Sequence, residues 1–223
     1  MKSESIERRV HIGEVIRNAA VFNFRKSRGD EMNTDTLLDT VSRLFGLLSE
    51  REIEYALVGG IALLQYVEGR NTDDIDLVLA PSSLQRLPEI LIVSRDADFA
   101  HGTFGVVRVD LLLTSNSLFE KVRQSYVTTR RFIEQEVPCA TVEGLLLMKM
   151  YALPSLYRQG SFARVGLYEN DIATLLHDCK PNLEPLLEEL ALHLSATDLA
   201  EVHRIITEIH ERIERFEEGS TRS

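Results

Sequence analysis

The sequence has no apolar run approaching the ~20 residues that a membrane-spanning helix requires. Its opening stretch, MKSESIERRV, lacks the apolar core of a secretory signal peptide. The two cysteines, Cys139 and Cys179, lie far apart without the spacing of a metal site, and the six histidines form no ligand cluster. These absences predict a cytoplasmic protein that has reduced cysteines and no membrane partner.

The composition is that of a soluble globular protein with an uneven charge. The 223 residues are 44% hydrophobic and 27% charged, which suits one large domain or two small ones. The net charge is −10, and the part from Val165 onward holds 13 acidic and 5 basic residues, so that −8 of the total lies there. Such an acidic chain is not an obvious non-specific nucleic-acid binder, although a local basic patch in the nearly neutral part could hold nucleic acid.

The chain is predicted to consist of an N-terminal extension (1–32), a mixed core (33–141) and a helical C-terminal region (142–223). In the core, apolar patterning predicts strands at 55–58, 75–79 and 104–113 and a short extended piece within 131–140. Helices are predicted at 34–48, 61–66, 82–90 and 117–125, and after residue 141 at 142–153, 167–177, 183–193 and 197–216. The predicted fold class is α+β: a short mixed sheet flanked by helices, followed by an α-helical half.

Two carboxylates share one face of the second predicted strand. Asp74 and Asp76 are two positions apart, so their side chains project from the same face while Ile75 and Leu77 enter the core. Two ionised carboxylates side by side repel each other unless a cation or solvent screens them. Hard oxygen ligands at this spacing predict a Mg²⁺ or Mn²⁺ site.

A third acid, Asp110, lies within the apolar run of the third predicted strand. One explanation is a buried Asp that pairs with Arg108 or with another arginine across the sheet. The other explanation is that Asp110 completes a three-carboxylate metal cluster with Asp74 and Asp76. Such a cluster can hold two metal ions about 3.5–4 Å apart, which activate an attacking oxygen and stabilise a leaving one.

Two glycines follow the first predicted strand. Gly59 and Gly60 let the backbone come close to a ligand, and the helix that starts there offers N–H groups to phosphate oxygens. A Gly-Gly pair alone is weak evidence. Its position before Asp-x-Asp on the next strand and Asp110 on a third strand makes it a strong signal for phosphate chemistry.

This pattern resembles the DNA polymerase β-type nucleotidyltransferase superfamily. The matching residues are Val58-Gly59-Gly60, Asp74-Ile75-Asp76 and Asp110. The stretches YALVGGIAL (55–63) and RNTDDIDL (70–77) are closer still to the AbiEii-like and related minimal nucleotidyltransferases, many of which are toxins of bacterial toxin–antitoxin systems. The helix LLLMKMYAL (145–153) matches the lysine helix of that branch. The resemblance covers roughly residues 35–180.

The resemblance implies a transferase mechanism and assigns residues to it. Asp74, Asp76 and Asp110 are the expected metal ligands and catalytic residues, with Asp110 nearest the acceptor hydroxyl. Gly59, Gly60, Arg70, Thr72 and Lys149 are the expected nucleotide-binding residues. A lone lysine on an apolar helix ordinarily extends to solvent, so the phosphate role of Lys149 rests on the resemblance.

The expected activity is the metal-dependent transfer of a nucleoside monophosphate from a nucleoside triphosphate to a hydroxyl. The resemblance implies RNA, such as a tRNA end, or a protein as the acceptor, with an antibiotic as a further option, and a cognate antitoxin as a partner. The main alternative is a non-catalytic nucleotidyltransferase-like module for binding or regulation. A metal-dependent phosphohydrolase would explain the carboxylates but not the glycines.

Overall fold

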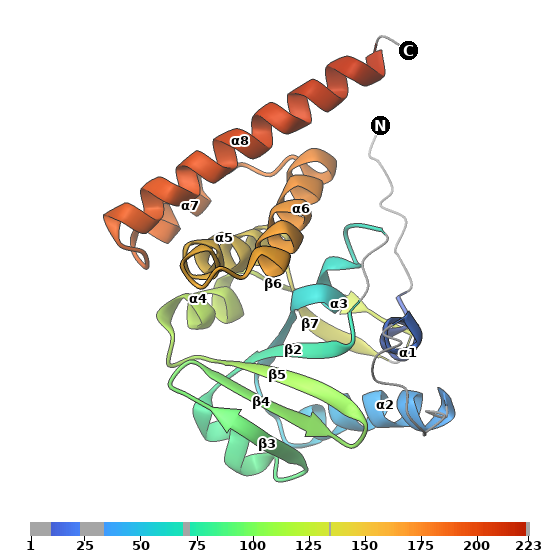
Figure 1. Cartoon of the computed structure of the whole chain (residues 1–223). Coiled ribbons are helices and arrows are strands. Elements are labelled where there is room, and N and C mark those ends of the chain that lie inside the picture. Colours follow the sequence, from blue (N-terminus) through green and yellow to red (C-terminus); the bar gives the residue numbers. More distant parts are fainter. Residues whose placement is uncertain (1–9, 23–33, 69–71, 134, 222–223) are drawn as a thin grey trace. The chain divides into compact units, whose positions relative to one another are not determined.

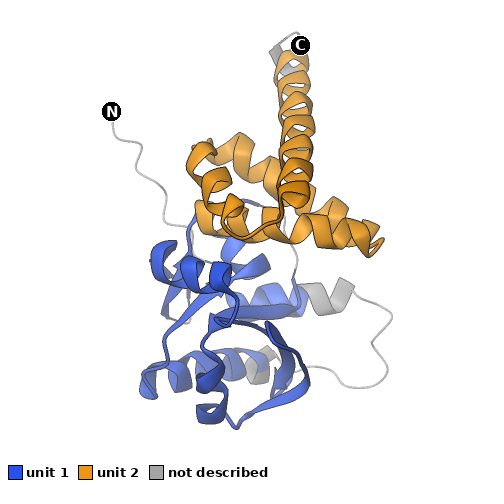
Figure 2. Cartoon of the chain, turned by 90° about the vertical axis from the view of Figure 1, so that its left-hand side faces the viewer, with its two compact units in different colours: residues 1–141 blue, residues 142–223 orange. Residues whose placement is uncertain are grey.

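The computed structural model describes the backbone of residues 10–22, 34–68, 72–133 and 135–221. The chain divides into two compact units, residues 1–141 and residues 142–223, shown in blue and orange in Figure 2. Within the described residues, no helix is both long enough and apolar enough to cross a bilayer. The predicted boundary between extension and core falls at 32, which lies outside the described residues.

Unit 1 is built on one seven-stranded mixed sheet (Figure 1). Its strands are β1 (Tyr55–Val58), β2 (Asp74–Leu79), β3 (Ile90–Arg95), β4 (Phe99–Phe104), β5 (Val107–Leu113), β6 (Val127–Arg131) and β7 (Glu136–Ala140). Their order across the sheet is β3-β4-β5-β2-β1-β7-β6. The pairs β2–β5 and β1–β7 are parallel, and the other neighbours are antiparallel.

Helix α2 (Thr34–Glu50) closes one face of this sheet. Its apolar residues recur every three or four positions and are fully buried at Leu37, Val41, Leu44, Phe45 and Leu48. The Phe45 ring lies 6.0 Å from the ring of Tyr55 in β1, and α2 also packs on β5. Side chains of a strand alternate between its two faces. The buried residues of β5 point toward α2, and the residues between them therefore point to the opposite face of the sheet.

The opposite face carries α3 (Gly59–Leu63) and α4 (Ser117–Ser125). Asn116 caps α4 because its side-chain oxygen accepts from the backbone N–H groups of Leu118 and Phe119, at 3.1 and 3.4 Å. Phe119 then packs edge-on against the Phe99 ring of β4, with centroids 5.4 Å apart. Residues of β2 and β5 on this face remain only half-buried, so part of it is open to solvent.

Helix α1 (Ile12–Phe22) packs against α2 within unit 1. Ile12 and Ile16 are buried, and a Cβ added at Gly13 would meet the Cδ2 of Leu38 at 2.3 Å, so the two helices approach closely at this glycine. Val10 forms an isolated parallel bridge with Phe132. Apolar residues of α1 therefore contribute to the core of this unit.

The α+β class predicted from the sequence is confirmed, but the sheet is larger than predicted. The helix predicted at 82–90 is wrong, because the 3₁₀ helix η1 (Pro81–Arg86) ends early and β3 follows. Pro88 disfavours helix at Leu87, and the β-branched run after it favours a strand. The predicted strand 104–113 begins too early: Phe104 is the last residue of β4, and β5 starts at Val107 after a turn in which Gly105 has φ +57°.

Unit 2 consists of four helices in the described residues: α5 (Val142–Arg158), α6 (Phe162–Cys179), α7 (Glu184–Ala191) and α8 (Ala196–Thr221). The prediction that the first of them ends before Pro154 is wrong, since Pro154 lies buried inside α5. A proline costs one backbone hydrogen bond, and the buried Met150 and Leu153 beside it hold the helix together through packing. The helix ends soon afterwards at Arg158, two residues before Gly160, whose φ is +65°.

A buried ion pair joins α5 to α6. Lys149 is 6% exposed and Asp171 is 2% exposed, and the Nζ of Lys149 donates to the Oδ2 of Asp171 at 2.7 Å. The same ammonium lies 4.5 Å from the centroid of the Tyr168 ring. Removal of one partner from such a pair leaves a charge buried without its counter-ion, which is far more costly than replacement of both.

We expect the substitution Asp171→Asn to lower the free energy of unfolding by about 3–5 kcal/mol, because it removes the carboxylate that the buried Lys149 ammonium contacts at 2.7 Å. The free energy of unfolding of the double variant Lys149→Met/Asp171→Leu should fall by less than that of Asp171→Asn alone. Urea denaturation of the full chain measures both. Glu201→Gln is the matched control, since it removes an exposed ion pair with Arg204 and should cost less than about 1 kcal/mol. Equal losses for Asp171→Asn and Glu201→Gln would contradict this assignment.

Candidate metal centre and active site

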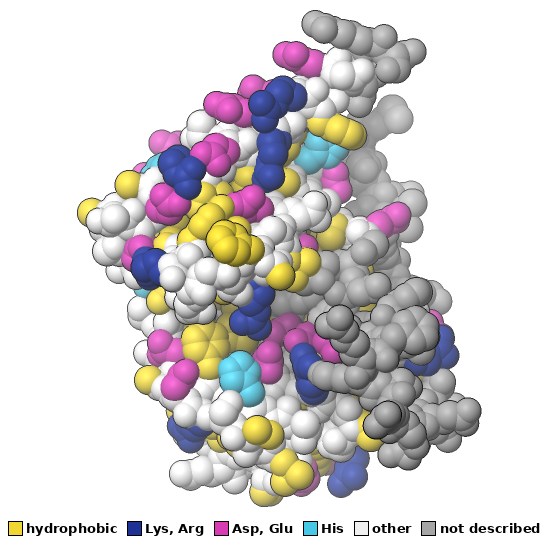
Figure 3. Space-filling view, viewed as in Figure 1, with side chains coloured by type: hydrophobic (Ala, Val, Ile, Leu, Met, Phe, Trp, Pro, Cys, Tyr) yellow, Lys and Arg dark blue, Asp and Glu magenta, His cyan; other side chains and the backbone are white. Residues whose placement is uncertain are grey.

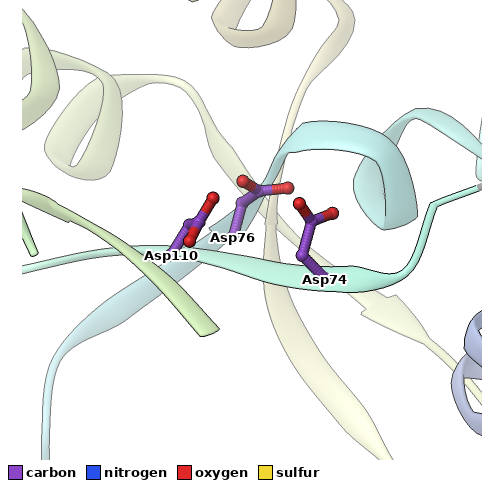
Figure 4. Close-up of side chains that lie close together, drawn as sticks. All are labelled: Asp74, Asp76 and Asp110. Carbon is purple, nitrogen blue, oxygen red and sulfur yellow. The ribbon is translucent and has the colours of Figure 1, made fainter. Parts of the chain in front are cut away.

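Three carboxylates meet on the open face of the sheet. Asp74 and Asp76 lie on β2, and Asp110 lies on the parallel neighbour β5, directly opposite Asp76. Each of the three residues offers one carboxylate oxygen, and these oxygens all lie within 4.8 Å of one another (Figure 4). The side chains are half-buried, so the cluster is accessible from solvent.

The alternation of side chains along the two strands produces this cluster. Ile75 and Leu77 of β2 and Val109 and Leu111 of β5 are fully buried. Residues between them point to the other face, where the register places Asp76 beside Asp110 and Asp74 beside Arg108. Burial of the apolar set therefore fixes the direction of the acidic set.

Gly59 makes room for one of the carboxylates. It follows Val58, which pairs with Asp76 across the β1–β2 ladder, and its φ is +66°, a left-handed conformation that favours glycine. A Cβ built at Gly59 would lie 1.8 Å from the Oδ2 of Asp76, so no other residue fits without displacing that carboxylate. The glycine predicted for approach to phosphate thus lies against a metal-ligand candidate.

Gly60 makes room for the residue that holds the other β2 carboxylate. A Cβ at Gly60 would meet the Cβ of Thr72 at 2.6 Å. Thr72 is 8% exposed, and its hydroxyl donates to the Oδ1 of Asp74 at 2.5 Å. A hydrogen bond of this kind orients a metal-ligating carboxylate, so the predicted nucleotide contact Thr72 acts in the structure on Asp74.

Two further side chains contact the cluster. The Nη2 of Arg108 lies 3.4 Å from Asp73 and 3.5 Å from Asp74, and the Nδ1 of His101 lies 2.9 Å from the Oδ1 of Asp110. Asp110 is thus half-buried and contacts His101, whereas the alternative explanation for this acid is a buried Asp paired with Arg108 or with another arginine across the sheet. The guanidinium of Arg108 offsets only part of the charge of the carboxylates that it contacts, which suits a site for a cation.

The residues present fit a divalent metal ion of the magnesium type. Oxygen ligands around such an ion lie about 2.0–2.1 Å from it, and therefore about 3–4 Å from one another. The observed separation of up to 4.8 Å between the carboxylate oxygens needs only small side-chain rotations to reach this range. All donors are carboxylate oxygens, the ligand type that Mg²⁺ and Mn²⁺ prefer.

Comparison with known proteins identifies the fold. No protein-family model and no curated protein matches the chain. Among solved structures, it is similar to an antigenic nucleotidyltransferase-like protein from Paracoccidioides brasiliensis, with a TM-score of 0.52, 19% identity, and coverage of 79% of this chain and 89% of that chain. The chain has a nucleotidyltransferase fold. It is also similar to the antibiotic-resistance factor ANT(2'')-Ia, with a TM-score of 0.49, 12% identity, and coverage of 83% of this chain and 98% of that chain.

Arg70 and Lys149 are the two other predicted nucleotide-binding residues. Arg70 lies outside the described residues. Lys149 lies on α5 of unit 2, where it contacts Asp171 and Tyr168 rather than extending to solvent. A role of either residue at the phosphates of a nucleotide stays a prediction.

Sequence reasoning missed the contribution of β4 to the site. His101 is opposite Asp110, and Phe99 lies two positions before it on the same face. The signal was present, because Phe99, His101 and Thr103 alternate with the small residues Ala100 and Gly102. A period of two in residues 99–103 would have predicted this strand and the histidine beside the acids.

We expect Gly59→Ala to displace the Asp76 carboxylate and to weaken binding of Mn²⁺ about 10- to 100-fold, as loss of an orienting partner does at other metal sites. The left-handed conformation should also cost about 1–2 kcal/mol of stability. Titration calorimetry with Mn²⁺ and urea denaturation measure the two effects.

The matched control is Gly46→Ala in α2, where an added Cβ has no atom within 4 Å. This variant should bind Mn²⁺ as the unmodified chain does and gain about 0.5–1 kcal/mol of stability. Unchanged Mn²⁺ affinity in Gly59→Ala would show that Gly59 does not position the carboxylate.

Proposed function

We propose that the protein is a metal-dependent nucleotidyltransferase that moves a nucleoside monophosphate from a nucleoside triphosphate to a hydroxyl acceptor. The observation that carries this proposal is the meeting of Asp74, Asp76 and Asp110 at one open position on a nucleotidyltransferase fold. Gly59 and Thr72 support it, because both hold carboxylates of this cluster in place.

Asp74, Asp76 and Asp110 would hold Mg²⁺ or Mn²⁺. When bound, the ion would neutralise charge on the phosphates of the nucleotide and lower the pKa of the attacking hydroxyl. The β2 pair would serve the triphosphate, and Asp110 would face the acceptor. This division follows from position, since Asp74 and Asp76 adjoin the Gly59–Gly60 turn whereas Asp110 adjoins β4.

Asp110 would act as the proton acceptor of the transfer. The acceptor oxygen forms a bond to the α-phosphorus, and the bond from that phosphorus to the oxygen of the β-phosphate breaks. The hydroxyl proton passes to Asp110 and then to water, and the electron pair of the broken bond leaves with pyrophosphate. His101 would orient Asp110 for this role, because its Nδ1 contacts the Oδ1 of the carboxylate.

The remaining predicted residues complete the proposal for the nucleotide. The backbone at Gly59 and Gly60 would lie near the phosphates, and the family resemblance assigns to Arg70 and Lys149 the supply of positive charge to a nucleotide. Thr72 would contribute through Asp74, whose carboxylate it already orients. For the acceptor, the family resemblance favours RNA or a protein hydroxyl, with an antibiotic as a further option.

We expect Asp74→Asn and Asp110→Asn each to reduce transfer at least about 100-fold, because the first removes charge from the metal site and the second also removes the proton acceptor. The full chain is incubated with Mg²⁺, each α-labelled nucleoside triphosphate, and total RNA or total protein, and the labelled fraction is quantified. Asp39→Asn on the exposed surface of α2 is the matched control and should retain activity.

Undiminished labelling by Asp74→Asn would refute the assignment of the site. Absence of labelling by the unmodified chain with every nucleotide and both fractions would favour the non-catalytic binding module.

We further propose that the protein belongs to the AbiEii-like branch and acts as the toxin of a toxin–antitoxin pair. The resemblance at residues 55–63, 70–77 and 145–153 supports this branch. Induced expression in a bacterial host should then arrest growth, and the Asp74→Asn variant at equal expression should not, because growth arrest would depend on transfer. Equal growth of both strains would contradict the toxin role and leave the transferase proposal standing.

A further inference from the structure

The open face of the sheet continues beyond the carboxylates onto β4. The β4–β5 register places His101 opposite Asp110, Phe99 opposite Leu112 and Thr103 opposite Arg108. Opposite residues of an antiparallel pair point to the same face, so Phe99 and His101 share the face of the carboxylate cluster. Figure 3 shows that acidic, histidine and hydrophobic side chains lie near one another on the surface of unit 1.

Phe99 and His101 form a pair of parallel rings beside the cluster. Their planes are inclined by only 1° and their centroids lie 6.4 Å apart. A second side chain contacts each ring. Phe99 packs edge-on against Phe119, with centroids 5.4 Å apart, and His101 contacts Asp110. Phe99 is nevertheless 37% exposed, so an anchored apolar ring faces solvent next to the proposed reaction centre.

The turn before β4 fixes the position of Phe99. The Oδ1 of Asp96 accepts from the backbone N–H groups of Asp98 and Phe99 at 2.9 and 2.8 Å, and the N–H of Asp96 donates to the carbonyl of Phe99 at 2.8 Å. Donation from these two N–H groups holds the pKa of Asp96 below its usual range. The ring is therefore ordered before any ligand arrives, which lowers the entropy cost of binding.

Arg108 supplies a positive charge on the other side of Asp110. It lies two positions before Asp110 on β5, and its side chain is 46% exposed. Its contacts to Asp73 and Asp74, at 3.4 and 3.5 Å, are at the long limit for hydrogen bonds. The guanidinium can therefore reorient toward an anionic ligand and give up only these two weak contacts.

We propose that Phe99, His101 and Arg108 form the acceptor subsite and bind the 3′-terminal nucleotide of a single-stranded RNA. The terminal base would stack on the rings of Phe99 and His101, and its phosphate would contact Arg108. The ribose hydroxyl would then lie near Asp110, between the two. This subsite rests on the proposed transferase function, because Asp110 faces the acceptor in that mechanism.

The dimensions and chemistry of the subsite suit a nucleotide. His101 lies opposite Asp110, two positions from Arg108 along β5, and residues two apart on a strand are separated by about 7 Å. This spacing is comparable to the distance between the base and the phosphate of one nucleotide. Phe99, opposite Leu112, lies two positions beyond His101. Single-stranded RNA ends are recognised by stacking of unpaired bases on aromatic rings and by arginine contacts to phosphate. An exposed arginine at this point disfavours a polycationic antibiotic, and a protein hydroxyl gives no reason for a phosphate contact.

Fluorescence of an RNA oligonucleotide with a 3′-terminal 2-aminopurine tests the subsite, in Mg²⁺ and without a nucleoside triphosphate. The unmodified chain should quench the fluorophore on binding, because quenching reports stacking. Phe99→Leu keeps an apolar side chain against Phe119 but removes the ring, and it should weaken binding about 5- to 150-fold and abolish the quenching. Phe99→Trp should restore both.

Leu91→Ala is the control variant, since it removes an exposed apolar side chain of the same sheet on the edge strand β3. It should bind and quench as the unmodified chain does. A second control lies in the ligand: an oligonucleotide with an abasic 3′ end should bind the unmodified chain and Phe99→Leu with equal affinity. If Phe99→Leu weakens the abasic and the intact oligonucleotide equally, Phe99 does not contact the base and the proposal fails.

The outcomes separate this proposal from the transferase function. Transfer of label to RNA that is insensitive to Phe99→Leu would overturn the subsite and leave the function standing. Ring-dependent quenching without any transfer would support the subsite and count against the function. Equal affinity for the matching DNA oligonucleotide, or ring-dependent labelling of protein instead of RNA, would overturn the assignment to RNA.

Discussion

The candidate site depends on the register of β2 against β5. A shift of one residue would turn Asp110 toward the face closed by α2 and separate it from Asp76. Two carboxylates about 4 Å apart repel by about 1 kcal/mol in water and by about 4 kcal/mol near a protein surface. Each fully buried Ile, Leu or Val on the same two strands contributes about 1.5–3 kcal/mol, and at least six are buried there. Apolar packing on one face thus outweighs electrostatic repulsion on the other.

Gly59 and Gly60 also make room for residues at the carboxylate cluster. Gly59 and Gly60 were identified from the sequence as a place where the backbone approaches phosphate. In the structure each also borders the cluster, Gly59 through Asp76 and Gly60 through Thr72. The glycine turn and the two acids that follow it in the sequence therefore form one structural unit. The absence of side chains at Gly59 and Gly60 leaves the space that Asp76 and the Thr72 side chain occupy.

Strands buried on at least one face were predictable, and the sheet edge was not. The apolar runs at β1 and β2 predicted both strands and the common face of Asp74 and Asp76. The strand β3 is exposed along most of its length, so its apolar residues do not alternate with polar ones and do not predict a strand. The sequence predicts no element for residues 91–103, and β4 before Phe104 is therefore missed. The consequence for the site is specific, since His101 and Phe99 lie on that unpredicted strand. For Lys149, the sequence predicts the helix but not the contact. The ion pair with Asp171, 22 positions away, depends on the packing of α5 against α6.

The distribution of charge constrains how such a site could work. A nucleoside triphosphate and an RNA end are both anionic, and both would have to approach three carboxylates whose charge Arg108 offsets only in part. Repulsion of this kind forbids binding unless cations enter first or together with the nucleotide. The acidic surplus of the chain, −8 of −10, lies after residue 164, so the first 164 residues, which include the sheet that carries the site, hold a net charge of only −2. Metal loading is therefore the step on which affinity for either anionic substrate would depend, and arginines at the edge of the cluster would act only once the carboxylates are neutralised.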